Sequence, residues 1–270
     1  MVKKLFKHEF HFYGRIMAIV YAILLTVSVA TRIIVHFESD TTAYEIIRAF
    51  TYITYVVSAM ATFFFAFVMG IVRFYKNMFT SEGYLTHTLP VTANQHIMVK
   101  TVTAVCVNWT STIMVLLSFV IIIPADHWNT MWKDLGLVLG EVFGYLKVDA
   151  ILIAVEYFIL LVLASFSGIM LYYTCISLGQ LFKKNRILAA VGVYFAYYIL
   201  TQIVSTIMTI SLTVFTASNA YLYDMMMWIG EHPMQTIHII MWSVIVIAFL
   251  FVAIEYLVIR WVMTKKLNLE

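Results

Sequence analysis

Charged residues are scarce in this chain of 270 residues: Lys, Arg, Asp and Glu make up only 11%, whereas about 25% is usual in soluble proteins. A soluble domain of this length would need many more of them to cover its surface, so the composition excludes an ordinary soluble enzyme. Proline, cysteine and glycine number only 3, 2 and 10, which excludes collagen-like, disordered and disulfide-rich chains. With 63% hydrophobic residues, the chain is predicted to be an all-α polytopic membrane protein.

Six apolar runs are long enough to cross a hydrocarbon core of roughly 30 Å, which takes about 20 helical residues. They cover residues 15–37, 47–72, 98–125, 148–181, 187–217 and 237–263. These runs are continuous, unlike the alternating strands of about ten residues in a transmembrane β-barrel. The sequence therefore predicts one six-helix transmembrane domain over 15–270. An amphipathic helix over 1–14, with basic and aromatic residues, is predicted to lie at the lipid interface before it.

The distribution of basic residues predicts the orientation of the spans. With six spans, both termini share one side with the second-to-third and fourth-to-fifth connections. Thirteen of the seventeen Lys and Arg residues fall on that side, and the other side has only Arg32, Arg48, Lys133 and Lys147. By the positive-inside rule, we expect a multi-pass protein of the cell membrane with both termini in the cytoplasm. Topology then accounts for the net charge of +3, and no nucleic-acid partner is expected.

Motifs for an energy source are missing from the sequence. It contains no G-x-x-x-x-G-K-[ST] and no G-x-G-x-x-G, and no cytoplasmic segment is long enough for an ATPase domain. Any ATPase would therefore be a separate polypeptide. We expect no metal site, because His8 and His11 lack a third ligand nearby, and we interpret Cys106 and Cys175 as small apolar residues within spans.

The cytoplasmic connection over 73–100 is longer than the joining of two helices requires. Thr92 and Gln95 predict a capping box at the start of the third span. Before that box, Glu82–Gly83 is predicted to break the helix. A short apolar cluster of Tyr84, Leu85 and Leu89 follows, and Pro90 ends it. From the pattern alone, this element is either a docking surface for a partner or a segment that lies on lipid headgroups.

The same connection resembles the inner-loop signature of ABC-2 type permeases, the membrane subunits of bacterial ABC transporters. The resemblance rests on SEGYL at 81–85, LPVT at 89–92 and Lys100 at the entry to a span. It extends to the interface helix, the six spans and the cytoplasmic termini. It implies a half-transporter that forms a dimer with a second permease, identical or paralogous, and binds two ABC ATPase subunits. ATP and Mg would be held by those ATPases, and no cofactor is expected on this non-catalytic chain.

The resemblance further implies that 73–97 is a coupling loop seated in a groove of the ATPase. The matching positions are Phe79, Glu82, Gly83, Tyr84, Leu85, Leu89 and Pro90. Closure of the ATPases on ATP would move this loop and switch the spans between inward and outward arrangements. The expected substrate is amphipathic and would be exported or extracted: an antimicrobial peptide, which would confer resistance, a lipid or a drug.

Two connections on the opposite side are rich in apolar residues. Segment 126–147 has apolar residues at helical spacing, which predicts an amphipathic helix on the outer leaflet or a long extension of the fourth span. Its glycines at every fourth residue would permit close helix contact. Segment 218–236 matches the place where the family has short re-entrant helices. There Tyr221, Met225 and Trp228 are candidates for substrate contact, and the alternative is an interfacial anchor.

Ionisable and polar residues within spans are costly and therefore informative. Glu156 is expected roughly 12 Å along the fourth span, where it could face a translocation path, pair with another span or bond a hydroxyl. Asn108 is a second candidate for the path, although it could instead make a packing hydrogen bond. Glu255 is expected near the inner boundary, where it would snorkel or pair with a basic neighbour such as Arg260.

Two alternatives from other classes remain open. One is an intramembrane enzyme that uses Glu156 with His36 or His238, although the sequence has no H-E-x-x-H or G-x-S-x-G motif. The other is an ATP-independent, ion-coupled carrier. Such carriers often contain an internal repeat, but here the long connection after the second span has no counterpart after the fifth.

Overall fold

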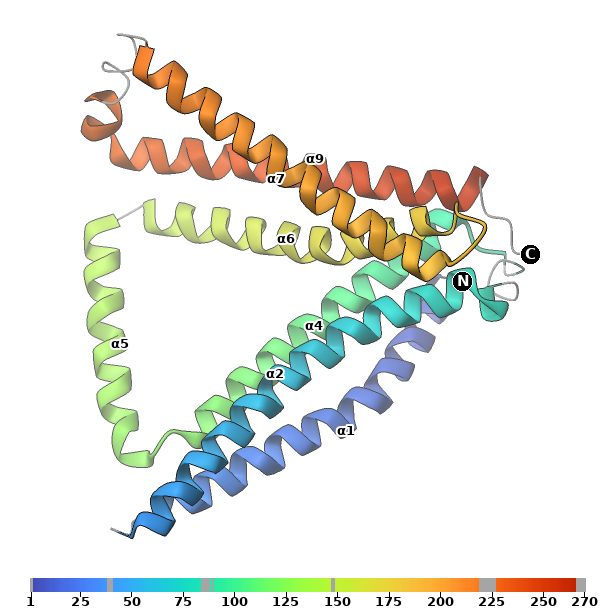
Figure 1. Ribbon diagram of the computed structural model, residues 1–270. Coiled ribbons are helices and arrows are strands. Elements are labelled where there is room, and N and C mark those ends of the chain that lie inside the picture. The colour runs from blue at the N-terminus through green and yellow to red at the C-terminus, as the bar shows by residue number, and fades with distance from the viewer. Residues whose placement is uncertain are drawn as a thin grey trace. The chain divides into compact units, whose positions relative to one another are not determined.

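The computed structural model describes residues 2–37, 41–83, 88, 90–146, 149–218 and 227–265, and within these ranges it contains helices and no strands. Six helices in this part of the chain are long and apolar enough to cross a membrane. They are α1 (Val2–His36), α2 (Thr42–Phe79), α4 (Ala93–Ile122), α6 (Asp149–Gly179), α7 (Arg186–Ser218) and α9 (Pro233–Lys265) (Figure 1). The prediction of an all-α polytopic membrane protein is confirmed.

The helices form two compact units, Met1–Tyr145 and Leu146–Glu270. In the first unit α1, α2 and α4 pack against one another, and α5 (Ala125–Leu146) follows α4. In the second unit α6 packs along α9 and also contacts α7 (Figure 1).

α1 is continuous from the predicted interface segment into the first span. No helix boundary separates residues 1–14 from the span, because the helix runs unbroken from Val2 to His36. Gly14 is the only weak helix former at that point, and its cost of about 1 kcal/mol does not end a long helix. Glu9, Tyr13 and Met17 are buried at intervals of four residues. One face of the first turns of α1 is therefore buried against other helices of the protein, and the same helix continues directly into the first span.

Small and hydroxyl-bearing side chains hold the three helices of the first unit together. Ser111 and Ser118, two turns apart on α4, bond the phenol oxygens of Tyr21 on α1 at 2.8 Å and Tyr55 on α2 at 3.1 Å. A Cβ added to Gly70 of α2 would lie only 3.3 Å from the Cβ of Ala104 on α4. Such contacts are typical of membrane helices, whose association depends on close packing and interhelical hydrogen bonds.

The start of α4 contains the predicted capping box. The backbone N–H of Gln95 donates to the Thr92 hydroxyl at 3.4 Å, and the backbone N–H of Thr92 donates to the Gln95 side-chain oxygen at 3.1 Å. These two bonds satisfy backbone donors that a helix N-terminus leaves unpaired. They fix the residue at which the long connection ends and α4 begins.

A short turn joins α6 to α7 in the second unit. An added Cβ at Gly179, the last residue of α6, would lie 2.7 Å from the backbone nitrogen of Ala190 on α7. Asn185 just before α7 adopts a left-handed conformation with φ of 54°, which asparagine tolerates better than most residues. The turn therefore depends on one residue without a side chain and on one that accepts positive φ.

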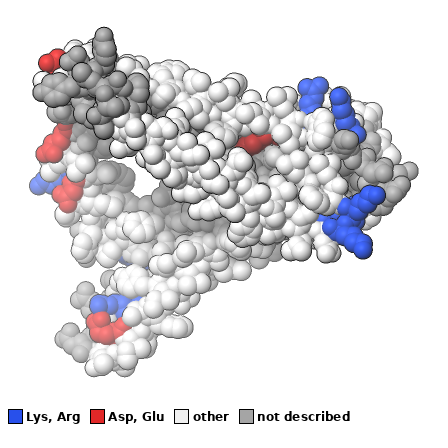
Figure 2. Space-filling view, turned by 45° about the horizontal axis from the view of Figure 1, so that its top comes forward, with Lys and Arg blue, Asp and Glu red and all other residues white. Residues whose placement is uncertain are grey.

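The surface between the helix ends is largely apolar. Figure 2 shows a mainly uncharged surface on which Lys and Arg side chains are gathered in a few small groups. Exposed residues on α7 include Ile199, Leu200 and Ile203. So large an exposed apolar surface is expected of helices that contact lipid.

Candidate coupling and translocation sites

The predicted coupling residues fall into three groups. Phe79 and Gly83 are buried, and Glu82 and Pro90 are exposed. The remaining three, Tyr84, Leu85 and Leu89, lie outside the described residues. Phe79 packs its ring edge-on against Phe74 of the same helix, with centroids 5.7 Å apart. Of the four positions that are described, two are therefore accessible at the surface of the chain.

Gly83 is held close to the end of α2. Its backbone N–H donates to the carbonyl of Thr80 at 2.8 Å, and an added Cβ would lie 2.7 Å from the carbonyl oxygen of Met78. A side chain at this position would therefore displace the backbone at the end of α2. The glycine identified in the sequence as a helix break is required here by a close backbone approach.

A buried ion cluster joins α1, α2 and α4 beside the long connection. The two carboxylate oxygens of Glu9 accept from Arg73 Nε at 3.1 Å and from Lys100 Nζ at 3.0 Å. Glu9 and Lys100 are 3% and 4% exposed, respectively. Charges so far from water are tolerated only when paired and hydrogen-bonded, so the cluster fixes how the three helices meet.

Two further contacts extend this cluster. The Asn77 side-chain amide is best oriented with its oxygen accepting from Lys100 Nζ at 3.2 Å and its nitrogen donating to Glu82 at 3.1 Å. The guanidinium of Arg73 lies 3.7 Å from the centroid of the Phe12 ring, a cation–π contact. Glu82, one of the matching positions in the resemblance, is thereby connected to Glu9 through Asn77 and Lys100.

Glu156 of α6 pairs with His238 of α9 in the second unit. The imidazole Nδ1 lies 3.0 and 2.9 Å from the two carboxylate oxygens, and Glu156 is 5% exposed. Asp149, at the start of α6, lies 3.9 Å from Nε2 of the same imidazole. Of the three expectations for Glu156, pairing with another span is the contact that forms. No group of three or more His, Cys, Asp or Glu side chains in the described ranges could hold a metal ion.

Glu255 of α9 also faces α6, which the sequence did not predict. It is 4% exposed, and the hydroxyl of Ser167 lies 3.2 and 3.4 Å from its two carboxyl oxygens. The prediction that it snorkels or pairs with a basic neighbour such as Arg260 is wrong. The helix face that carries Glu255 packs onto α6, whereas Arg260 is exposed.

The structure describes only two of the four remaining candidates for substrate contact or the translocation path, Trp228 and Asn108. Trp228 is 38% exposed and stacks on His232, with ring centroids 5.0 Å apart, whereas Tyr221 and Met225 lie outside the described residues. Asn108 is half-buried on α4. Asn108 belongs to the first unit and Trp228 to the second.

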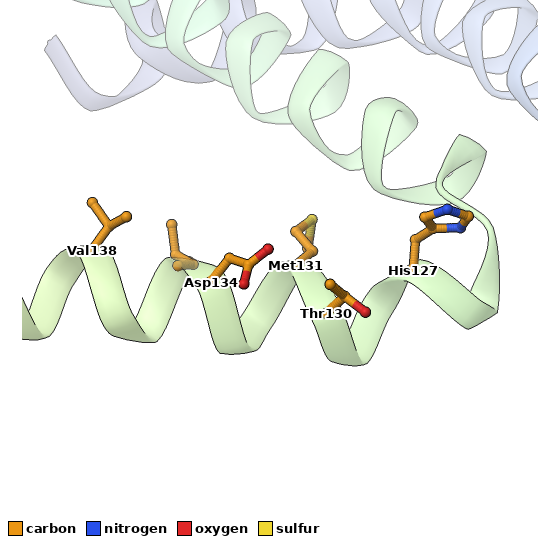
Figure 3. Close-up of a pocket in the computed structure, with 6 residues that line it drawn as sticks. His127, Thr130, Met131, Asp134 and Val138 are labelled. Carbon is orange, nitrogen blue, oxygen red and sulfur yellow. The ribbon is translucent and has the colours of Figure 1, made fainter.

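α5 is the amphipathic helix predicted over 126–147. It carries an open pocket of about 480 Å³, which Figure 3 shows beside His127, Met131 and Asp134. All the described residues that line it belong to this one helix, so none of them forms a second wall opposite α5. Nothing within 4 Å would meet an added Cβ at glycines 136, 140 and 144, so the predicted close helix contact is not formed by the described residues.

Sequence reasoning missed the roles of three residues. The helix predicted at the lipid interface over 1–14 includes Glu9, and this isolated acid among Lys3, Lys4 and Lys7 is a signal for a specific partner. His238 was considered only for catalysis. Arg32 donates to the main-chain carbonyls of Ile122 and Ile123 at the end of α4, a contact that no sequence pattern indicates.

No family model, curated protein or solved structure matched this chain. The case for any function therefore depends on the residues described above.

Proposed function

We propose that the chain is the permease subunit of an ATP-driven ABC-2 type exporter that moves an amphipathic substrate, such as an antimicrobial peptide, a lipid or a drug. Six membrane-spanning helices, a long connection between α2 and α4, and the resemblance of that connection to the family signature support this function. In this proposal both termini and the connection lie in the cytoplasm, where two ATPase subunits bind, and a second permease completes the transporter.

The observation that carries the proposal is the link between the connection and the ion cluster. Glu82 bonds Asn77, and Lys100 bonds both Asn77 and Glu9. A partner that moves the connection would therefore act on α1, α2 and α4 together rather than on one helix end. This is the mechanical requirement for an ATPase that works on a separate membrane subunit.

Co-purification tests the proposal. The chain would be purified from its native cells through an affinity tag on the chain only, and the proteins that co-purify would be identified by mass spectrometry. We expect the ATPase to co-purify with the wild-type chain and to be lost with Tyr84→Asp and Leu85→Asp. Leu137→Asp, at an exposed position on α5 that should not touch the ATPase, is the matched control. Failure of the wild-type chain to retain any ATPase, or unchanged retention by both loop variants, would contradict the assignment.

The Glu156–His238 pair favours a second candidate, an ion-coupled carrier that works without an ATPase. Paired acidic and imidazole side chains within membrane helices are typical of proton relays. The purified chain alone, reconstituted in vesicles, separates the two functions. Substrate uptake driven by an imposed proton gradient would support the carrier, and uptake that depends on ATP and the ATPase would support the exporter.

A further inference from the structure

Three glutamates are buried in the described part of the chain, and their surroundings differ. Glu9, Glu156 and Glu255 are 3%, 5% and 4% exposed. Glu9 contacts Arg73 and Lys100, and Glu156 contacts an imidazole nitrogen at 2.9 Å. Among the described residues, no Lys, Arg or His forms an ion pair with Glu255. Glu255 is thus buried to the same extent as the other two without a cation.

In the part of the chain that the structure describes, the groups that neighbour Glu255 come from α6 and α7 and carry no formal charge at neutral pH. On α6, Ser167 bonds its carboxyl group, and Thr174 donates to its main-chain carbonyl at 3.4 Å. Cys175 of α6 and Tyr197 of α7 lie within electrostatic reach of the carboxyl group. A negative charge here would be opposed only by hydroxyl dipoles, and any thiolate or phenolate would add to the repulsion.

The membrane environment decides which form of the carboxyl group is favoured. An isolated carboxylate costs far more to bury than a neutral acid, because its loss of hydration is not repaid by an opposite charge. The neutral acid can donate its O–H to Ser167, since a serine hydroxyl accepts as well as donates. The 3.2 Å separation of the two oxygens suits such a bond.

We propose that Glu255 is a proton-binding site within the membrane-spanning part of the second unit, occupied when α6 and α9 pack as described. The bound proton lies between the carboxyl group and the Ser167 hydroxyl. Its release requires water to reach the contact between α6 and α9, so proton loss and separation of these helices occur together. The site is independent of the proposed ATPase partner, because every group that forms it belongs to this chain.

Dicyclohexylcarbodiimide provides the test, because it reacts with neutral carboxylic acids in apolar surroundings. The acid proton moves to one nitrogen of the reagent, and a carboxyl oxygen adds to its central carbon. The acyl group then shifts to the second nitrogen and gives a stable N-acylurea. Nothing leaves, so the labelled peptide gains the whole mass of the reagent, which mass spectrometry of the digested protein detects.

We expect labelling of Glu255 at pH 7 in lipid vesicles and a decline as the pH is raised. Glu156 is the internal control: it is equally buried, but the His238 imidazole contacts both of its carboxyl oxygens, so its labelling should be lower. Equal labelling of both glutamates, or of neither, would overturn the proposal. Protection of Glu255 by sodium ions at constant pH would also overturn it, since the site would then bind a metal cation.

Thermal unfolding of variants provides a readout that does not depend on the reagent. Glutamine has the shape of the neutral acid, so Glu255→Gln should unfold at the wild-type temperature at pH 7. Glu156→Gln, which removes one of the two carboxyl oxygens that contact His238, should unfold at a lower temperature. A Glu255→Gln variant as destabilised as Glu156→Gln would show that the carboxyl group is ionised in the native protein.

Discussion

At the scale of single residues, the ion cluster of Glu9, Arg73 and Lys100 is the contact most sensitive to substitution. A buried ion pair adds little net stability compared with an apolar pair, because both charges lose their hydration. Removing one member is much more costly, because the remaining charges stay buried without their partner. The cluster therefore makes the packing of α1, α2 and α4 specific, and any change in it affects all three helices.

Glu9→Gln is expected to lower the free energy of unfolding by about 3–5 kcal/mol, since Lys100 is left buried without its carboxylate. Chemical denaturation of the detergent-solubilised protein measures the change. Glu45→Gln is the matched control: Glu45 pairs with Arg48 at 2.6 Å, but both side chains are about half exposed. That change should cost at most about 1 kcal/mol. Equal losses in the two variants would contradict the importance assigned to burial.

Residue contacts of this kind could be only partly predicted. The Thr92–Gln95 capping box follows from local spacing, and the sequence predicts it correctly. Glu156 and His238 are 82 residues apart, and no periodicity indicates which faces of two apolar helices will meet. Both helices are apolar nearly all round, so the pattern that identifies them as spans contains little information on their mutual rotation.

At the scale of elements, helix ends depend on a few close backbone approaches. Gly179 at the end of α6 lies against Ala190 of α7, and Gly168 in the middle of α6 has open space where a side chain would be. Replacing each of these two glycines by alanine therefore separates the effect of a steric clash on stability from the effect of helix propensity.

Gly179→Ala should destabilise the second unit, because the new methyl group would meet backbone atoms of Ala190 that cannot move without shifting α7. Gly168→Ala should be neutral or stabilising by about 1 kcal/mol, since alanine is the better helix former and meets no neighbour. Thermal unfolding of the two variants in one detergent measures both. A Gly168→Ala variant less stable than Gly179→Ala would contradict the contact between α6 and α7.

The two opposite faces of α5 differ in sequence, which predicts which face contacts lipid. Leu135 and Leu139 share one helical face, and Lys133 and Leu137 lie on the opposite one; the three leucines are all 43–58% exposed in the isolated chain. We expect the first face to lie in the lipid interface. Spin labels on cysteines at 135 and 139, in a background without Cys106 and Cys175, should collide with oxygen more often than labels at 133 and 137 do. The labels at 133 and 137 should instead collide more often with a water-soluble nickel chelate. Equal accessibility of the two faces would exclude an interfacial helix.

At the scale of the whole molecule, hydropathy predicts the six spans well, because length and apolar composition are sufficient for that purpose. The continuity of α1 could not be predicted in the same way. Residues 1–14 have the composition of a surface helix, and their packing depends on Lys100 and Arg73, which are far away in the sequence. The orientation of the spans stays a prediction from the distribution of basic residues.

Cysteine accessibility tests that orientation. A single cysteine at Ser81 or Lys184 should react with a membrane-impermeant maleimide only in inside-out vesicles. A cysteine at Asn129 should react only in right-side-out vesicles. The reason is that the first two lie in connections rich in Lys and Arg, whereas Asn129 lies on the side that carries few basic residues. The reverse pattern would place both termini outside and would exclude the proposed contact with a cytoplasmic ATPase.

The ion cluster also has a consequence for the order in which the protein is made. Glu9 leaves the ribosome early, whereas Arg73 and Lys100 follow 64 and 91 residues later. During synthesis, Arg73 becomes available to Glu9 when the end of α2 is made, and Lys100 only when the start of α4 follows. A nascent chain arrested before α4 lacks Lys100 and so cannot complete this contact. Glu9 therefore gains its full set of partners only after the start of α4 has been made.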